Sequence, residues 1–239
     1  MTNKEIQDCI IYQDASFLIA NKPAGISAQD DLSDGESFHK LLEAFSTKKL
    51  FVVHRLDRPT SGVMVFAKKN KAAAHFSKLM AQKGSEKKYL AAVKNAPKEP
   101  EGELTNYLYH DTKLKKCFIS KEANKQAKIG TLTYKTLTKI ENYTLLEVSL
   151  ESGRFHQIRA QLSSIGSPIK GDVKYGARRG NKDRSINLHS YKLSFHLLYD
   201  NELIKLQAAI PNEPVWEAFK EILPEIGENK YEKWKQEQT

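Results

Sequence analysis

A chain of 239 residues, of which 40% are apolar and 28% charged, can form one substantial core or two subdomains that share a cleft, and its composition is that of a soluble globular protein. Its apolar runs have only a handful of residues, against the ~20 of a membrane-spanning helix, and its first residues lack the apolar core of a signal peptide. We therefore expect a cytoplasmic protein with no membrane partner. The formal net charge of +9 is unevenly spread.

The N-terminal part predicts short strands followed by helices. Residues 10–23 predict two strands joined by a turn at 14–15, and the polar residues 26–36 predict a loop. Ser37 is placed to cap a helix whose apolar residues recur at i, i+3, i+4 and i+7. Asn70 is placed to cap a second helix.

From residue 88 onward the pattern is mainly that of strands, with irregularly spaced helices. This order predicts an α+β fold rather than a doubly wound parallel sheet. The expected strands cover 89–93, 104–109, 117–120, 132–138, 143–149, 186–198 and 202–210, with hairpin turns at 141–142 and 200–201; helices are expected over 156–165, ended by Gly166, and from Pro214 to about 223, followed by a frayed helix in the tail.

Two cysteines, Cys9 and Cys117, are too few for a disulfide framework and lack the paired spacing of a zinc site. We expect both to be free thiols. The glycines from Gly166 to Gly171 have the spacing of a phosphate-binding loop, but Asp172 stands where that loop needs a lysine. The sequence therefore predicts neither a metal site nor a nucleotide-binding loop.

The most informative segment is residues 54–62, with the sequence HRLDRPTSG. It lies between apolar runs at 50–53 and 63–67, which predict strands. A loop held by a strand on each side presents its side chains rigidly, and this one presents the carboxylate of Asp57 among two arginines and a histidine. On spacing alone, a turn-forming aspartate paired with a neighbouring arginine is as good an interpretation as a catalytic one.

Residues 54–62 closely resemble the central motif of the RluA-type pseudouridine synthases, which isomerise uridine in RNA to its C-glycoside. Further blocks resemble the family in the same order, from about residue 10 to about residue 215. They are NKPAG at 21–25, KYLAAV at 88–93, GRFHQIR at 153–159, GSPIKGD at 166–172 with YG at 175–176, and LH at 188–189.

The resemblance implies a mixed, mostly antiparallel bent sheet with flanking helices and a central RNA-binding cleft. It implies ribosomal or transfer RNA as the partner, with no organic cofactor and no metal. It also implies that the small basic module preceding the catalytic domain in some members is absent here. We expect one catalytic domain over residues 1–239, ending in a polar tail at 225–239 and acting as a monomer.

The resemblance makes Asp57 the catalytic aspartate, since a carboxylate can attack covalently or abstract a proton. Whether Asp57 attacks the substrate or removes the C2′ proton stays open. Arg159 is implied as the partner that keeps Asp57 ionised, because an arginine can be buried without losing its charge. Tyr89 maps to the family's active-site tyrosine, which stacks on uracil and can relay a proton. Without the resemblance, Arg159 and Tyr89 are ordinary helix-surface and strand residues.

A second set of residues is implied to bind the substrate. Arg55 is the candidate for filling the gap that uridine leaves when it flips out of the RNA stack. His54, His156 and His189 are expected to shape the pocket by hydrogen bonds rather than to act as bases. The full substrate-binding set is Lys22, His54, Arg55, Leu56, Arg154 and Ile158.

Basic residues cluster in two segments, 112–128 and 170–184. One lysine-rich stretch alone is most simply a solvated surface. Two of them beside a motif that acts on RNA favour contacts to a phosphate backbone, because each neutralised phosphate releases condensed counterions. The expected backbone contacts are Lys115, Lys116, Arg178 and Arg179.

The chain departs from the family pattern at two places, and two other functions compete. Gln161 stands where many relatives have histidine, and residues 27–30 lack the usual His-Pro; both differences are expected to affect which uridine is accepted. One rival is a catalytically silent RNA-binding protein on the same fold, which the joint presence of Asp57, Tyr89 and Arg159 disfavours. The other is a small-molecule hydrolase with Asp57 as nucleophile, which leaves the basic segments unexplained.

Overall fold

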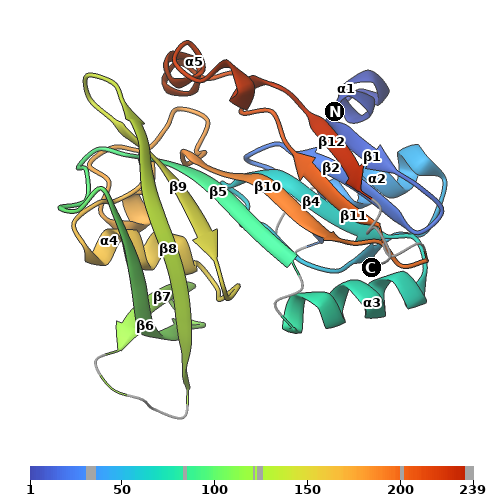
Figure 1. Ribbon diagram of the computed structural model, residues 1–239, viewed down its shortest axis with the longest axis horizontal. Coiled ribbons are helices and arrows are strands. Elements are labelled where there is room, and N and C mark those ends of the chain that lie inside the picture. Colours follow the sequence, from blue (N-terminus) through green and yellow to red (C-terminus); the bar gives the residue numbers. More distant parts are fainter. Residues whose placement is uncertain (31–35, 83–84, 121, 123–125, 200–201, 235–239) are drawn as a thin grey trace. The chain divides into compact units, whose positions relative to one another are not determined.

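The computed structural model describes residues 1–30, 36–82, 85–120, 122, 126–199 and 202–234 (Figure 1). It has the α+β fold that the sequence predicts, with helices beside a mostly antiparallel sheet. The chain divides into two compact units: unit 1 comprises Met1–Lys87, Ser190–Pro211 and Glu225–Thr239, and unit 2 comprises Lys88–His189 and Asn212–Pro224. In the described part of the chain, no helix has both the length and the apolar character needed to cross a bilayer.

Unit 1 is built on antiparallel strand pairs with helices packed against them. β1 pairs with β2, β2 with β4, β10 with β11 and β11 with β12, and β4 also pairs with β3. The elements are α1 (Asn3–Cys9), β1 (Ile10–Gln13), β2 (Phe17–Lys22), α2 (Phe38–Ser46), β3 (Phe51–Val52), β4 (Ser61–Ala67), α3 (Asn70–Ala81), β10 (Leu188–His196), β11 (Leu203–Gln207), the 3-10 turn η2 (Pro224–Gly227) and β12 (Lys230–Trp234).

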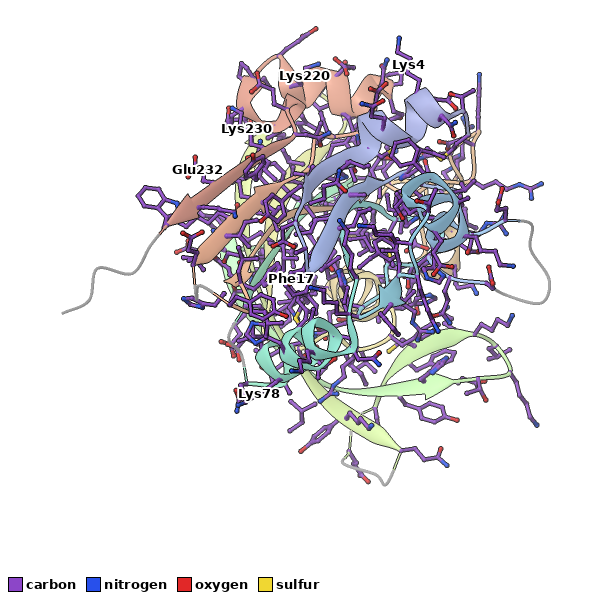
Figure 2. The ribbon with its side chains drawn as sticks, turned by 90° about the vertical axis from the view of Figure 1, so that its right-hand side faces the viewer. Lys4, Phe17, Lys78, Lys220, Lys230 and Glu232 are labelled. Carbon is purple, nitrogen blue, oxygen red and sulfur yellow. The ribbon has the colours of Figure 1, made fainter. Side chains whose placement is uncertain are left out.

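An aromatic cluster forms the core of unit 1. The Phe195 ring packs edge-on against Phe17 and Phe76, with ring centroids 5.4 and 5.0 Å away, and all three side chains are fully buried. Figure 2 shows Phe17 inside the unit and Lys78 on the outer face of α3. The amphipathic pattern of α3 therefore fixes which face of the helix meets the sheet.

Sequence signals for helix ends succeed in α2 and fail in α3. The Ser37 hydroxyl accepts a hydrogen bond from the Lys40 N–H, as a capping residue should. Asn70 is instead the first residue of α3, and the cap position is Lys69, which makes no side-chain cap bond. The predicted Asn70 cap is wrong, because the chain enters this helix directly from β4.

The two ends of the described chain also differ from the prediction. Residues 3–9 form α1, which begins with a reciprocal capping box between Thr2 and Glu5. The tail is not a frayed helix, because β12 pairs in register with β11, Leu203 facing Trp234 and Gln207 facing Lys230. The predicted turn at 200–201 lies outside the described residues.

Unit 2 is an antiparallel sheet in the order β5, β9, β8, β6, β7, with α4 packed on one face. The hairpin of β8 and β9 is the one that the sequence predicts. The elements are β5 (Ser85–Val93), β6 (Glu101–Asp111), β7 (Lys116–Ser120), β8 (Ala127–Lys139), β9 (Thr144–Leu150), α4 (Gln157–Ser164), the 3-10 turn η1 (Val173–Tyr175) and α5 (Pro214–Lys220).

Both helices of unit 2 follow their sequence signals. Gly166, with φ +79°, follows the end of α4 in the left-handed conformation that glycine adopts most readily. Pro214 occupies the first turn of α5, which ends at Lys220, three residues earlier than predicted. Ile158 and Leu162 on α4 pack into the core against the sheet, so residues 156–159 of the GRFHQIR block are held on a rigid element.

Candidate active site

Asp57 lies in a loop between β3 and β4 that is tied down by backbone hydrogen bonds. The Thr60 N–H donates to the Asp57 carbonyl at 3.0 Å, which closes a tight turn. The neighbouring Arg58 carbonyl accepts from the Gly25 N–H at 2.8 Å, and the Arg58 Nε–H donates to the Gly25 carbonyl at 2.8 Å. The NKPAG and HRLDRPTSG blocks are therefore two halves of one local structure.

Lys22 connects these two blocks through hydrogen bonds from its buried ammonium. Its side chain has no exposed surface, and its Nζ donates to the carbonyls of Pro23 at 2.8 Å, Ile26 at 3.0 Å and Arg58 at 3.4 Å. Burial lowers the pKa of Lys22 to about 7, while the charge of Asp57 acts to raise that pKa. The predicted substrate-binding Lys22 is thus a buried support of the Asp57 loop.

His54 and Leu56 anchor the other end of the loop. The Val65 N–H donates to His54 Nε2 at 2.9 Å, so this nitrogen carries no proton. Burial lowers the pKa of His54 to about 4, which keeps the ring neutral at physiological pH. Leu56 is buried and Arg55 is exposed. The chain thus holds the Asp57 loop on both sides and leaves Arg55 exposed.

In unit 2, Arg159 forms a buried two-pronged ion pair with Asp172. The Arg159 Nε donates to Asp172 Oδ2 at 2.7 Å and its Nη2 donates to Oδ1 at 2.9 Å, with 5% of Arg159 and 1% of Asp172 exposed. The arginine is not on the helix surface. The expected pairing of Arg159 with Asp57 stays a prediction, whereas the partner that the sequence analysis missed is Asp172.

Tyr175 extends the Arg159 cluster. The Arg159 guanidinium lies 4.9 Å from the centre of the Tyr175 ring. The Tyr175 hydroxyl accepts from the Cys117 N–H at 2.7 Å and lies 2.9 Å from His156 Nδ1. Burial and the Arg159 charge lower the pKa of His156 to about 3, so His156 is neutral here. That His156 shapes the pocket by hydrogen bonds, rather than acting as a base, stays a prediction.

The other predicted site residues of unit 2 lie on β5, just before α4 and at the start of β10. Tyr89 on β5 is half-buried and packs with Ile158 in one hydrophobic cluster. Arg154 is exposed and its Nε donates to the Ile129 carbonyl at 3.1 Å. His189 is fully buried beside Trp216, their ring centroids 6.1 Å apart.

The Gln161 side chain connects α4 to the sheet of unit 2. It is fully buried, and its amide donates to the Leu104 and Gly130 carbonyls and to Asn106 Oδ1 at 2.8 to 3.0 Å. These contacts tie α4 to β6 and β8. An effect of Gln161 on uridine selection stays a prediction, and any such effect would have to act through this helix.

Some cations of the basic segments are exposed, and at least one is held by hydrogen bonds and an ion pair within the fold. Arg178 and Arg179 are exposed and line a pocket of about 410 Å³ together with Lys94 and Tyr143. Lys170 lines it too, but its ammonium is held by Glu213 Oε1 at 2.8 Å and by two asparagines. Lys115 is exposed and Lys116 half-buried. Lys121 and Lys125 lie outside the described residues.

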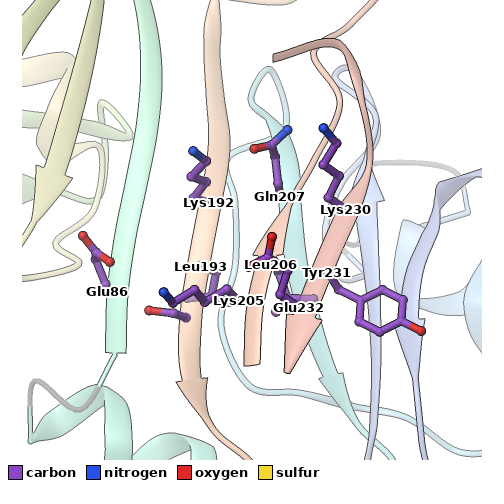
Figure 3. A pocket seen from close by; sticks show the side chains of 10 residues that line it. Glu86, Lys192, Leu193, Lys205, Leu206, Gln207, Lys230, Tyr231 and Glu232 are labelled. Atoms are coloured by element: carbon purple, nitrogen blue, oxygen red, sulfur yellow. The ribbon is translucent and has the colours of Figure 1, made fainter. Parts of the chain in front are cut away.

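A smaller pocket of about 180 Å³ lies over β10, β11 and β12 in unit 1 (Figure 3). Lys192, Gln207 and Lys230 form one cross-strand row of its lining, and Ser194, Lys205 and Glu232 form the next. Its charges are of both signs and it contains none of the residues singled out in the sequence, so it gives no support to the candidate site. Cys9 and Cys117 are free thiols, as predicted, and burial raises the pKa of each to about 11.

Within the described residues, no group of three or more histidine, cysteine or carboxylate side chains is placed to hold a metal ion. The side chains that the sequence singles out for catalysis are the Asp57 carboxylate in unit 1 and, in unit 2, the buried Arg159 and the half-buried Tyr89. Such a set suits nucleophilic or proton-transfer chemistry on an organic substrate.

Comparison with known proteins decides the family. Residues 16–164 match the family model described as RNA pseudouridylate synthase. The chain belongs to the RNA pseudouridylate synthase family. It is similar to the tRNA pseudouridine synthase C of Vibrio parahaemolyticus, with 32% identity over 84% of this chain and 89% of that protein.

A second relative and a solved structure agree with this membership. The chain is 32% identical to the ribosomal large subunit pseudouridine synthase D of Borreliella burgdorferi, over 77% of this chain and 60% of that one. The solved structure of human RNA pseudouridylate synthase domain containing 4 superposes with a TM-score of 0.74 at 23% identity, covering 91% of this chain and 94% of the human one. The synthase therefore has the family's fold and isomerises uridine in RNA to pseudouridine.

Two features of the synthase were not found from its sequence. Asp172 stands where a phosphate-binding loop would need a lysine, and that mismatch hid its role. The available signals were the carboxylate partner that a buried Arg159 requires and the position of Asp172 in a block that resembles the family. Lys22 was expected near the substrate because it lies in the NKPAG block, and its full burial was not foreseen, since a lysine is almost never fully buried. The proline and glycine that follow Lys22 were the available signal for a tight turn with carbonyls to satisfy.

Proposed function

We propose that Asp57 is the catalytic carboxylate of this synthase and that Tyr89 and Arg159 act with it. The observation that carries the proposal is the rigid support of the Asp57 loop. The buried Lys22 ammonium, a backbone hydrogen bond from Gly25 and a side-chain hydrogen bond back to the Gly25 carbonyl together fix Arg58, the next residue. A catalytic group needs such fixed geometry, since small displacements cost large factors in rate.

The reaction is an isomerisation and requires no external reactant. The bond between N1 of uracil and C1′ of ribose breaks, the uracil turns while it is held, and C5 bonds to C1′ as the C5 proton is lost and N1 gains one. Asp57 serves either as the nucleophile or as the base that removes the C2′ proton. Tyr89 stacks on the uracil and its hydroxyl is placed to relay a proton.

Arg159 keeps the catalytic carboxylate ionised and oriented. A guanidinium carries five N–H donors, more than the two that it donates to Asp172, so the Asp172 pair is compatible with a second carboxylate. The ion pair also fixes the position of the arginine. Arg55, which is exposed beside Asp57, is our candidate for occupying the space that the flipped uridine leaves.

The proposed substrate is a structured ribosomal or transfer RNA. The two named relatives differ in the RNA that their names give: one is a tRNA pseudouridine synthase and the other a ribosomal large subunit pseudouridine synthase. Lys115, Lys116, Arg178 and Arg179 are proposed to contact its phosphates. We further propose that the synthase acts as a monomer in the cytoplasm without a cofactor.

The decisive experiment maps pseudouridine in total RNA from a strain that lacks this gene, complemented with wild type or with Asp57→Asn. Wild type should restore at least one site, and Asp57→Asn should restore none. In vitro, Asp57→Asn should lower turnover by at least ~10³-fold while RNA affinity is unchanged, because the amide keeps the shape and loses the nucleophile. The exposed Asp8→Asn variant is the matched control. Substantial turnover by pure Asp57→Asn would refute the assignment, and unchanged maps with wild type would refute the enzyme.

A further inference from the structure

The two faces of the β6, β7 and β8 sheet have different surroundings. On one face, Leu108 and Cys117 are buried against Ala160 of α4 and against Tyr175. Figure 1 shows α4 beside these three strands. Because successive side chains of a strand alternate between faces, the neighbours of Leu108 and Cys117 point the other way.

Apolar side chains gather on that other face. Tyr109 lies opposite Phe118 of β7, and Tyr107 lies opposite Ile129 of β8. Thr105 and Thr131, the next facing pair, share a hydrogen bond of 3.0 Å between their hydroxyls, which places this row of residues on one face. Phe118 is 38% exposed and Ile129 51% exposed, and both tyrosines are half-buried. We call Tyr107, Tyr109, Phe118 and Ile129 the β-sheet platform.

Cations border the platform at its β7 end. The Lys116 ammonium lies 5.4 Å from the centre of the Phe118 ring. Lys113 and Lys115 are exposed in the turn that connects β6 to β7. On the β8 side, the Arg154 guanidinium donates to the carbonyl of Ile129 itself. Of the three acidic residues of β6, Glu101 and Glu103 stand at the opposite end of that strand. The third, Asp111, stands at the turn to β7, where its carboxylate accepts from the N–H groups of Lys113 and Leu114.

We propose that the β-sheet platform stacks unpaired bases of the substrate RNA, with Lys116 and Arg154 holding the adjoining phosphates. The proposal rests on the proposed function in its choice of RNA as the partner. Aromatic rings on an open sheet, bordered by cations, are what sequence-tolerant binding of single strands requires, because every base offers a flat face to a ring. The synthase would therefore grip an unpaired segment that flanks the uridine it modifies.

Charge distinguishes RNA from a protein partner. An apolar patch that docks a protein has a core depleted of charged residues. Here a cation reaches a ring of the platform itself, since the Lys116 ammonium lies 5.4 Å from the centre of the Phe118 ring. Single-stranded RNA combines negatively charged phosphates with flat bases, so it matches both the cations and the rings of the platform.

The test compares two probes on the full-length synthase: a short single-stranded oligouridylate and an abasic ribose-phosphate strand of the same length. Wild type should bind the oligouridylate more tightly. Phe118→Ala and Tyr109→Ala should each weaken oligouridylate binding about tenfold, which is the size expected for one stacked base, and leave abasic binding unchanged. Phe118→Tyr should restore the difference between the probes. Lys116→Gln should weaken both probes and flatten the salt dependence.

The matched control is Tyr199→Ala in unit 1, because Tyr199 is 67% exposed and also has a lysine, Lys69, 5.8 Å from its ring. Equal affinity of wild type for both probes would overturn the proposal, as would ring variants that bind like wild type. Concentration-dependent dimerisation that Phe118→Ala abolishes, without any effect on oligouridylate binding, would assign the platform to a second copy of the chain. Pseudouridine formation is measured separately with Asp57→Asn, so failure of the catalytic assignment and failure of the platform give different results.

Discussion

A single buried lysine connects the catalytic loop to the stability of the protein. Lys22 donates to three backbone carbonyls, and two of them belong to the turn that follows it. Deep burial makes its charged form costly, and this cost is what lowers its pKa to about 7. The loop is thus held by a group whose charge changes within the physiological range.

We predict that the free energy of unfolding rises with pH above about 7 because of Lys22. Its pKa falls from an ordinary value of 10.5 in the unfolded chain to about 7 in the folded protein, so between these values the unfolded chain binds a proton that the folded chain does not. The destabilisation is complete below pH 7 and disappears towards pH 10.5. Urea unfolding of wild type and Lys22→Met from pH 6 upward measures it, with the exposed Lys4→Met as control. Parallel curves for wild type and Lys22→Met would contradict the prediction.

The Arg159 and Asp172 pair gives a second prediction at this scale. Asp172→Asn should lower the free energy of unfolding by about 3–5 kcal/mol, because it leaves a buried guanidinium without its counter-charge. Arg159→Lys should impair pseudouridine formation nearly as much as Arg159→Ala, since a lysine supplies charge without the two-pronged contact.

Denaturant unfolding and steady-state kinetics provide the two readouts. Asp111→Asn is a suitable control, since the Asp111 carboxylate accepts from the Lys113 and Leu114 N–H groups at the exposed β6 to β7 turn. An Arg159→Lys variant with wild-type activity would mean that the planar contact is not needed. The double variant Arg159→Met with Asp172→Leu should lose less stability than the two single changes together.

The roles of Asp57, Tyr89 and Arg159 follow from the blocks that resemble the family and stay predictions. The contacts of buried side chains, by contrast, could not be predicted from the sequence. The partnership of Arg159 with Asp172 depends on where α4 and the segment after it meet, and no local pattern encodes that contact. The environment of the buried Lys22 likewise includes a carbonyl, that of Arg58, from a loop more than thirty residues further along the chain.

At the scale of elements, one glycine of β4 allows this strand to lie very close to its neighbour β10. Gly62 has φ +116°, and a Cβ there would overlap the backbone of Ser190 on β10. All seven residues of β4 are buried. The close approach of β4 to β10 therefore fixes the position of β4, which begins where the Asp57 loop ends.

We predict that Gly62→Ala destabilises the protein by at least about 3 kcal/mol, from the left-handed backbone together with the overlap. Gly25→Ala is the matched comparison. Gly25 also has a positive φ, +88°, but nothing lies within 4 Å of the position its Cβ would take. Its cost should be only the backbone part, about 1–2 kcal/mol. Thermal unfolding of both variants measures the difference, and equal losses would show that the contact with Ser190 is unimportant.

Elements were predictable in proportion to their apolar periodicity. α2 and the hairpin of β8 and β9 have clear patterns, and the structure confirms them. α1 buries only Ile6 and β12 buries no residue, so neither has an apolar pattern that could reveal it. β12 exists because β11 offers it an edge, which is a property of the fold rather than of residues 230–234.

At the scale of the whole molecule, the net charge of +9 should govern RNA affinity. We predict that two double variants, Lys115→Gln with Lys116→Gln and Arg178→Gln with Arg179→Gln, each lower RNA affinity while changing the free energy of unfolding less. Each lost phosphate contact should flatten the slope of log affinity against log salt by roughly 0.7 to 0.9. Turnover of bound RNA should change little, because these side chains hold the substrate and make no bonds.

Binding titrations at several salt concentrations test this prediction, with Lys230→Gln as control because Lys230 is paired with Glu228 at 2.8 Å. Unchanged affinity and slope in both double variants would place the two basic segments on a solvated face. The RNA would then have to follow another path.

The division of the chain into units also sets an order for folding during synthesis. Unit 1 needs β10, β11 and β12, which leave the ribosome after every strand of unit 2, whereas β5 to β9 of unit 2 are consecutive. The apolar strand β4 must therefore wait without β10, its neighbour in the finished sheet, while the middle of the chain is made. Such delayed, non-local pairing is slow and leaves hydrophobic surface exposed. The buried residues of β4 consequently stay incompletely covered until β10 has been made, which gives a chaperone a surface to bind on the growing chain.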